Sequence, residues 1–136
     1  MSAEIKLRTK GEGDVRDITA DAAKAVSDSK VKDGIATIFV VGSTAAITTL
    51  EFEPGLVADM RGAAERLFPK GIEYEHHRRW DDGNGRSHVR AAFVGPSVTI
   101  PIVKGRLALG TWQQIILLEY DVRPRERTVV VQVVGR

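Results

Sequence analysis

The sequence has no cysteine, which excludes disulfides, thiolate metal sites and cysteine nucleophiles. It has no apolar run long enough to cross a bilayer, and no basic-then-apolar N-terminal segment of the kind that directs secretion. The sequence also lacks a long run of charges of a single sign, because its 20 basic residues are interleaved with its 18 acidic ones. We therefore expect a cytoplasmic protein with no membrane and no nucleic acid among its partners. The basic residues are expected to lie on a solvated face of the protein. The alternative is that folding gathers some of them into a basic groove.

Hydrophobic residues make up 43% of the 136 residues, enough to bury a core without disulfides or metal staples. We expect one domain, residues 1–136. Alternating or β-branched apolar patterns predict strands, and helical spacing of apolar residues predicts helices. The predicted strands are 5–8, 14–19, 35–41, 44–51, 97–103, 106–109, 111–120 and 127–134. The predicted helices are 19–29, capped by Thr19 or Asp21, and 54–68; residues 87–94 fit a helix capped by Ser87 or a strand.

Four details of the arrangement follow from these patterns. Strands 5–8 and 14–19 are expected to pair across a glycine turn, and the apolar run 35–41 to be covered on both faces. Strands 111–120 and 127–134 are expected to be central neighbours, and 74–85 to be a loop. Strands and helices do not alternate regularly, which predicts an α+β fold with a mixed or antiparallel sheet and a few helices.

All three histidines of the chain lie in or beside that polar loop, at positions 76, 77 and 88. Imidazole is the commonest protein metal ligand, and zinc favours two or three imidazoles with a carboxylate. His76 and His88 are expected to converge from the two ends of the loop, with Glu51 supplying an oxygen. Neighbouring side chains of an extended chain point apart, so His76 and His77 are not expected to share an ion. The spacing matches no fixed zinc motif, and a surface loop with incidental histidines is the alternative.

Three other segments have a functional and a structural interpretation. Ser43 and Thr44 follow a glycine at a strand break, which fits either phosphate binding through backbone N–H groups or a β-bulge. Trp112 would stack on a flat ring, with Gln113 as donor and acceptor, or else belong to the core. The arginine-rich run 123–127 fits a phosphate clamp or, more simply, a solvated turn.

Several blocks, taken in order, resemble the YjbQ-like family, also called the secondary thiamine-phosphate synthase family. They are STAAITTLE (43–51), YEH (74–76), NGRSHV (84–89), GPS (95–97), PIVKGRL (101–107), LGTWQQI (109–115), a glutamate at 119 and RER (125–127). The match spans nearly the whole chain, and the Gly-Thr-Trp-Gln block with the preceding Gly-Arg turn is distinctive.

The resemblance implies a small α+β sandwich of unusual topology that forms homotrimers, and some members of the family have weak thiamine-phosphate synthase activity. It transfers the polar site of the family onto Glu51, His76, Asn84, His88 and Gln113. One position departs from the family pattern. Where members usually carry histidine before the Ser/Thr-Thr-Ala block, this chain has Gly42, and His77 is the candidate substitute.

Two functions are compatible with this resemblance. In the first, a transferase joins a pyrimidine diphosphate to a thiazole phosphate and displaces pyrophosphate, with catalytic residues His76, His88 and Glu51, which also hold a divalent zinc or magnesium ion. The small phosphorylated ligand would be bound by the residues Ser43, Thr44, Asn84, Arg106, Trp112 and Gln113. In the second, the protein is a non-catalytic trimeric metal- or anion-binding protein whose site has degraded at Gly42.

Overall fold

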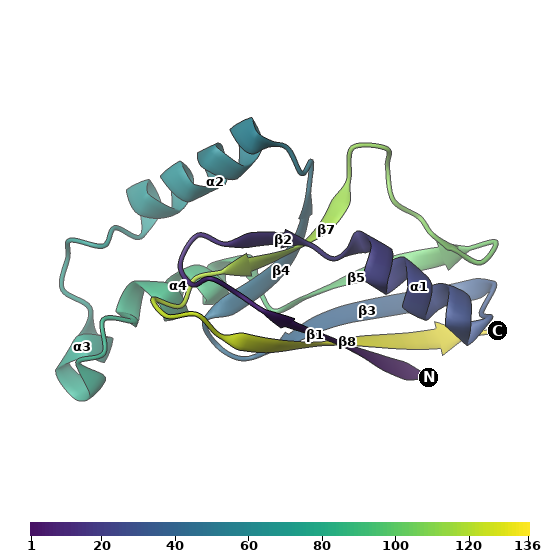
Figure 1. The fold of residues 1–136 in the computed structure, drawn as a ribbon, viewed down its shortest axis with the longest axis horizontal. Coiled ribbons are helices and arrows are strands. Elements are labelled where there is room, and N and C mark those ends of the chain that lie inside the picture. The colour runs from purple at the N-terminus through teal and green to yellow at the C-terminus, as the bar shows by residue number, and fades with distance from the viewer.

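The computed structural model describes residues 1–136, which form two antiparallel sheets packed face to face, with four helices (Figure 1). The larger sheet has the strand order β1 (Ser2–Arg8), β8 (Glu126–Gly135), β3 (Asp33–Val41), β5 (Ser97–Val103) and β6 (Arg106–Leu107). The smaller sheet has the order β2 (Val15–Asp17), β7 (Gln114–Glu119) and β4 (Ala45–Leu50). The helices are α1 (Thr19–Ser29), α2 (Pro54–Leu67), α3 (Glu75–Trp80) and α4 (Gly85–Val94). The expected α+β class is confirmed.

The main core lies between the two sheets, because alternate residues of each strand point inward. Ala36, Ile38 and Val40 of β3 are fully buried there against Ile115 and Leu117 of β7. The buried stripe of α1 closes one side of this core.

The outer face of the smaller sheet is also covered, by α4 and α2. Ile116 and Leu118 of β7 form a second buried cluster with Ala91 of α4, and Met60 and Ala64 of α2 pack against it. Strand β7 is therefore buried on both faces, which explains its continuous apolar sequence.

The outer face of the larger sheet is open and apolar. Ile35, Phe39 and Val41 of β3 are 45%, 42% and 54% exposed, beside exposed Val103 and Val134. The expectation that residues 35–41 are covered on both faces is therefore wrong for the single chain. Their inward residues pack in the core, but no helix covers the other side.

Two predicted strand pairings are also wrong. Strand β2 pairs with β7 instead of β1, and β7 and β8 belong to different sheets. The chain crosses between the sheets at the turns before β2 and before β8, where the backbone N–H of Thr9 donates to the carbonyl of Arg125 at 2.8 Å. Alternating or β-branched apolar patterns identify the strands, but they do not say which sheet each strand joins.

Residues 75–80 form the helix α3 where a loop was predicted. It has fewer than two turns and no buried residue, so no apolar period reveals it. Helix α4 begins at Gly85, before the predicted Ser87 cap, because the Ser87 hydroxyl donates back to the Asn84 side chain at 2.9 Å. In α1 the N-cap is Ile18, and the Asp17 carboxylate accepts the first N–H, from Thr19. None of the helices has both the length and the apolar character that a membrane span requires.

Candidate functional site

The histidines predicted to converge do so. His76 lies on α3 and His88 on α4, and their ring centroids are 4.5 Å apart with the planes inclined at 39°. Between the helices the chain reverses sharply at Asp81 and Gly83, both with positive φ (47° and 73°). This reversal brings the two imidazoles together.

The environment of this histidine pair leaves nitrogen atoms free to bind a ligand. Nδ1 of His76 is buried without a hydrogen bond; it lies 3.4 Å from Asp82 Oδ1, without hydrogen-bond geometry. Burial lowers the pKa of His88, and the nearby His76 lowers it further, while Asp82, Asp121 and the Ser43 backbone oppose the shift. His88 is therefore a neutral imidazole at pH 7, the form that binds metal.

A hydrogen bond donated by the Asn84 backbone lowers the pKa of Asp82, against burial, and the two histidines lower it further. The carboxylate beside the pair is therefore ionised. No three His, Asp or Glu side chains of the chain are arranged to hold a metal ion. The single chain thus offers two imidazoles as ligands rather than the predicted triad of His76, His88 and Glu51.

Asn84 is buried at the start of α4 and positions that helix rather than facing a ligand. Its Oδ1 accepts from the Ser87 hydroxyl at 2.9 Å and from the Val122 backbone at 3.1 Å, and its Nδ2 donates to Asp121 at 3.4 Å. Both ends of the amide are engaged by the protein, so α4 and His88 are fixed to the turn that follows β7.

A buried ion pair is joined to these hydrogen bonds through Asp121. The Arg127 guanidinium donates through Nε to Glu119 at 2.7 Å and through Nη2 to Glu119 and to the Thr44 hydroxyl, which itself donates to Asp121. The Glu119 side chain is fully buried and that of Arg127 is 7% exposed. The prediction that the arginine-rich run is only a solvated turn is therefore wrong at Arg127. Asp121, absent from the predicted site, is recognisable in sequence only as one acid of a polar turn.

Gly42 connects β3 of one sheet to β4 of the other, with φ of 143°. Nη1 of Arg127, which has no hydrogen bond, lies 2.7 Å from the position that a Cβ of residue 42 would occupy. Gly42 and Ser43 line an open hollow of about 360 Å³ together with His88. The missing side chain thus leaves a guanidinium nitrogen of Arg127 without a hydrogen bond beside Gly42.

We expect Gly42→Ala to lower the free energy of unfolding by about 1–3 kcal/mol, because a Cβ would meet a tethered guanidinium and the backbone conformation is strained for an L-residue. Urea denaturation measures the difference. Gly71→Ala is the control, since no atom lies within 4 Å of its Cβ position, and we expect a change below about 0.5 kcal/mol. Equal effects at the two glycines would contradict the interpretation.

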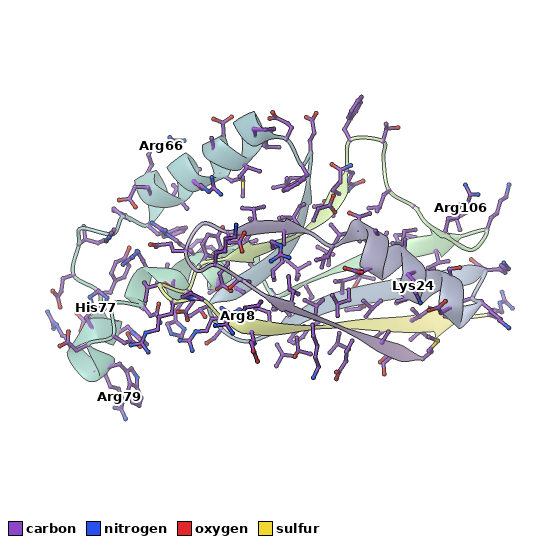
Figure 2. All side chains as sticks on the ribbon, in the orientation of Figure 1. Arg8, Lys24, Arg66, His77, Arg79 and Arg106 are labelled. Atoms are coloured by element: carbon purple, nitrogen blue, oxygen red, sulfur yellow. The ribbon has the colours of Figure 1, made fainter.

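The remaining predicted residues lie elsewhere. Glu51 follows β4, at the end of the strand opposite Ser43. The extended chain between these two residues spans about 25 Å. At that end the Gln113 amide donates to Thr49 at 3.1 Å and accepts from Gly110 at 3.0 Å, and Trp112 is 73% exposed. Arg106 lies at a third place, at the opposite end of the molecule from His77 (Figure 2).

His77 does not replace the missing histidine. Its Nε2 accepts from the Gly85 backbone at 3.3 Å, and its ring packs edge-on against Tyr74 with centroids 5.6 Å apart. As predicted, His76 and His77 have separate environments, although the reason is their position on a helix rather than in an extended chain.

The sequence and fold match one family throughout. The family model for UPF0047 protein YjbQ-like matches residues 3–136. A UPF0047 protein of Archaeoglobus fulgidus is 37% identical over 129 residues, covering 95% of this chain and 98% of its own, and one of Methanocaldococcus jannaschii is 38% identical over 136 residues, covering 99% and 95%.

Solved structures agree with this match. A YbjQ-like protein of unknown function from Sulfolobus solfataricus P2 superposes with a TM-score of 0.91 at 31% identity, covering 100% of this chain and 99% of its own. A hypothetical protein from Aeropyrum pernix K1 gives a TM-score of 0.91 at 32% identity with the same coverage. The chain therefore belongs to the UPF0047 (YjbQ-like) family.

Proposed function

We propose that the protein is a transferase of the thiamine-phosphate synthase type, whose reaction centre is the histidine pair, His76 and His88. The observation that carries the proposal is the 4.5 Å approach of these two rings beside an ionised Asp82. In the reaction, the thiazole nitrogen attacks the methylene carbon of the pyrimidine diphosphate. A C–N bond forms, the C–O bond breaks, and pyrophosphate leaves with the bonding electrons.

This exchange transfers no proton, so the protein must chiefly stabilise the negative charge of the leaving pyrophosphate. His76 and His88 would hold a divalent ion, zinc or magnesium, and that ion would supply the charge stabilisation. The two imidazoles fit zinc better than magnesium, which prefers oxygen ligands, because Nδ1 of His76 is buried without a partner and His88 is neutral. With only two protein ligands, such an ion would leave coordination positions for water or phosphate oxygens.

Residues around the pair have complementary roles in this proposal. Nη1 of Arg127 and the exposed Ser43 would donate hydrogen bonds to phosphate oxygens beside Gly42. The Thr44 hydroxyl is already bound by Asp121 and Arg127, and Asn84 by α4 and its neighbours, so both position other groups.

The proposal includes a homotrimer. The open apolar face of β3, β5 and β8 gives one chain a surface that association would cover. Glu51, Trp112, Gln113 and Arg106 lie too far from the histidine pair to act within their own chain, so they would join it only from a neighbouring copy. Light scattering tests this part, and a monomeric mass would contradict it.

Activity is tested by incubating the protein with both substrates and magnesium and measuring thiamine phosphate. We expect His88→Gln to reduce the rate by at least about tenfold, and His77→Gln, a matched change on the neighbouring face, to keep it. No product above the His88→Gln background would overturn the transferase proposal.

A second candidate is a non-catalytic protein that binds a metal ion or a small anion. Gly42 favours it, because a site that has lost one histidine retains binding groups without the full catalytic set. It predicts that pyrophosphate binds to the protein and that no thiamine phosphate forms. The same incubation distinguishes the two candidates by whether thiamine phosphate is produced.

A further inference from the structure

A polar pocket with residues of both α2 and α4 in its lining is separate from the histidine pair. Its volume is about 470 Å³, within the range of small-molecule sites. It is lined by the turn before β2, by Arg61 and Ala64 of α2, by Arg90 of α4 and by Tyr120 after β7. It shares no residue with the hollow beside His88.

The carboxylates of this pocket are already neutralised by the protein. Glu12 accepts from Arg86 at 2.6 and 2.9 Å and from Arg90 at 3.3 Å, and both arginine side chains are only 7% exposed. The hydrogen bond from Arg86 is the main cause of the lowered pKa of Glu12, so its charge is held there. Asp14 accepts from the Lys10 backbone at 2.9 Å and lies 3.8 Å from Arg16.

Three donors of the lining, by contrast, have no partner in the chain. Tyr120 is 93% buried, yet its hydroxyl makes no hydrogen bond, and burial raises the pKa of this phenol so that it stays protonated. Arg61 donates from Nε and Nη2 to the Gly13 carbonyl, which leaves Nη1 free. The Lys10 ammonium has no ion pair. The Tyr120 hydroxyl is not fully buried, since it keeps some contact with solvent, and so it remains available to a ligand.

We propose that this pocket binds the phosphate group of a small phosphate monoester. Two uncompensated positive charges, on Lys10 and Arg61, match the charge of a phosphate dianion, and the Tyr120 hydroxyl supplies a third donor to its oxygens. A carboxylate has one charge and two oxygens, so it would leave part of this donor set unused. The remaining pocket volume takes the organic part of the molecule.

The test is a titration of the full-length protein with inorganic phosphate at pH 8, followed by backbone amide NMR. We expect saturable shifts at residues 10–14 and 120. Tyr120→Phe should weaken binding by about fivefold and Arg61→Gln by about tenfold, the effect of losing one hydrogen bond and one charge-assisted hydrogen bond respectively. Arg66→Gln, a matched change elsewhere on α2 (Figure 2), should bind as the wild type does.

Tyr120→Phe also separates binding from folding. It removes a hydroxyl that no protein group uses, so the free energy of unfolding should not fall while phosphate affinity does. Acetate should bind at least about tenfold more weakly than phosphate, because it carries half the charge. The proposal is overturned if phosphate shifts the amide signals of residues 10–14 equally in the wild type and in Tyr120→Phe. It is also overturned if His88→Gln abolishes phosphate binding. The transferase assay is independent of both results.

Discussion

Replacing Arg127 by leucine should lower the free energy of unfolding by about 3–5 kcal/mol, the cost of leaving a buried charge without its partner. Glu119 would remain fully buried, with two of its charged hydrogen bonds gone. The Thr44 hydroxyl would lose the donor that links the residue before β4 to β8. Urea denaturation followed by circular dichroism measures the change.

Arg8→Leu is the matched control, since Arg8 pairs with Glu126 at 3.7 Å while both side chains are at least 75% exposed. Its effect should stay below about 1 kcal/mol, as for other surface pairs. The double variant Arg127→Leu with Glu119→Leu should regain part of the lost stability, because it removes the unpaired carboxylate. A loss at Arg127 no larger than at Arg8 would show that the pair is not buried as described.

His76→Gln and His88→Gln should each weaken zinc binding by about 100-fold, because each removes one of only two protein ligands. Replacing a residue that only supports a ligand costs about 10–100-fold in metal affinity. The matched variant His77→Gln should bind zinc as the wild type does, because His77 faces Tyr74 and the Gly85 backbone instead. Competition with a chromophoric chelator at pH 7.5 measures the affinities. Equal affinity in all four proteins would remove a metal ion from the proposed site.

The histidine pair was predictable because only eleven residues separate His76 from His88, and a short polar segment rich in turn residues brings its two ends close. The helical form of residues 75–80 was not, because α3 buries no residue and so shows no apolar period. The strands β3 and β8 were predictable because their runs of β-branched apolar residues favour extended structure, although these runs do not show that burial alternates along each strand.

The rest of the site depends on distances in space that cannot be read from the order of residues in the sequence. Glu51 stands only one strand away from Ser43 in the sequence, yet the extended strand β4 places the two at its opposite ends. The Arg127–Glu119 pair joins strands of different sheets, and charged residues in a turn-rich segment are usually solvated. Only the sandwich topology shows that this pair lies inside the protein.

His76 and His88 are proposed to form one ligand-binding centre together. Anomalous scattering from a crystal of the protein soaked in zinc measures whether they do. We expect one strong peak within about 2.1 Å of a nitrogen of each imidazole. A peak elsewhere, or rings that stay unoccupied while zinc binds at other positions, would contradict it.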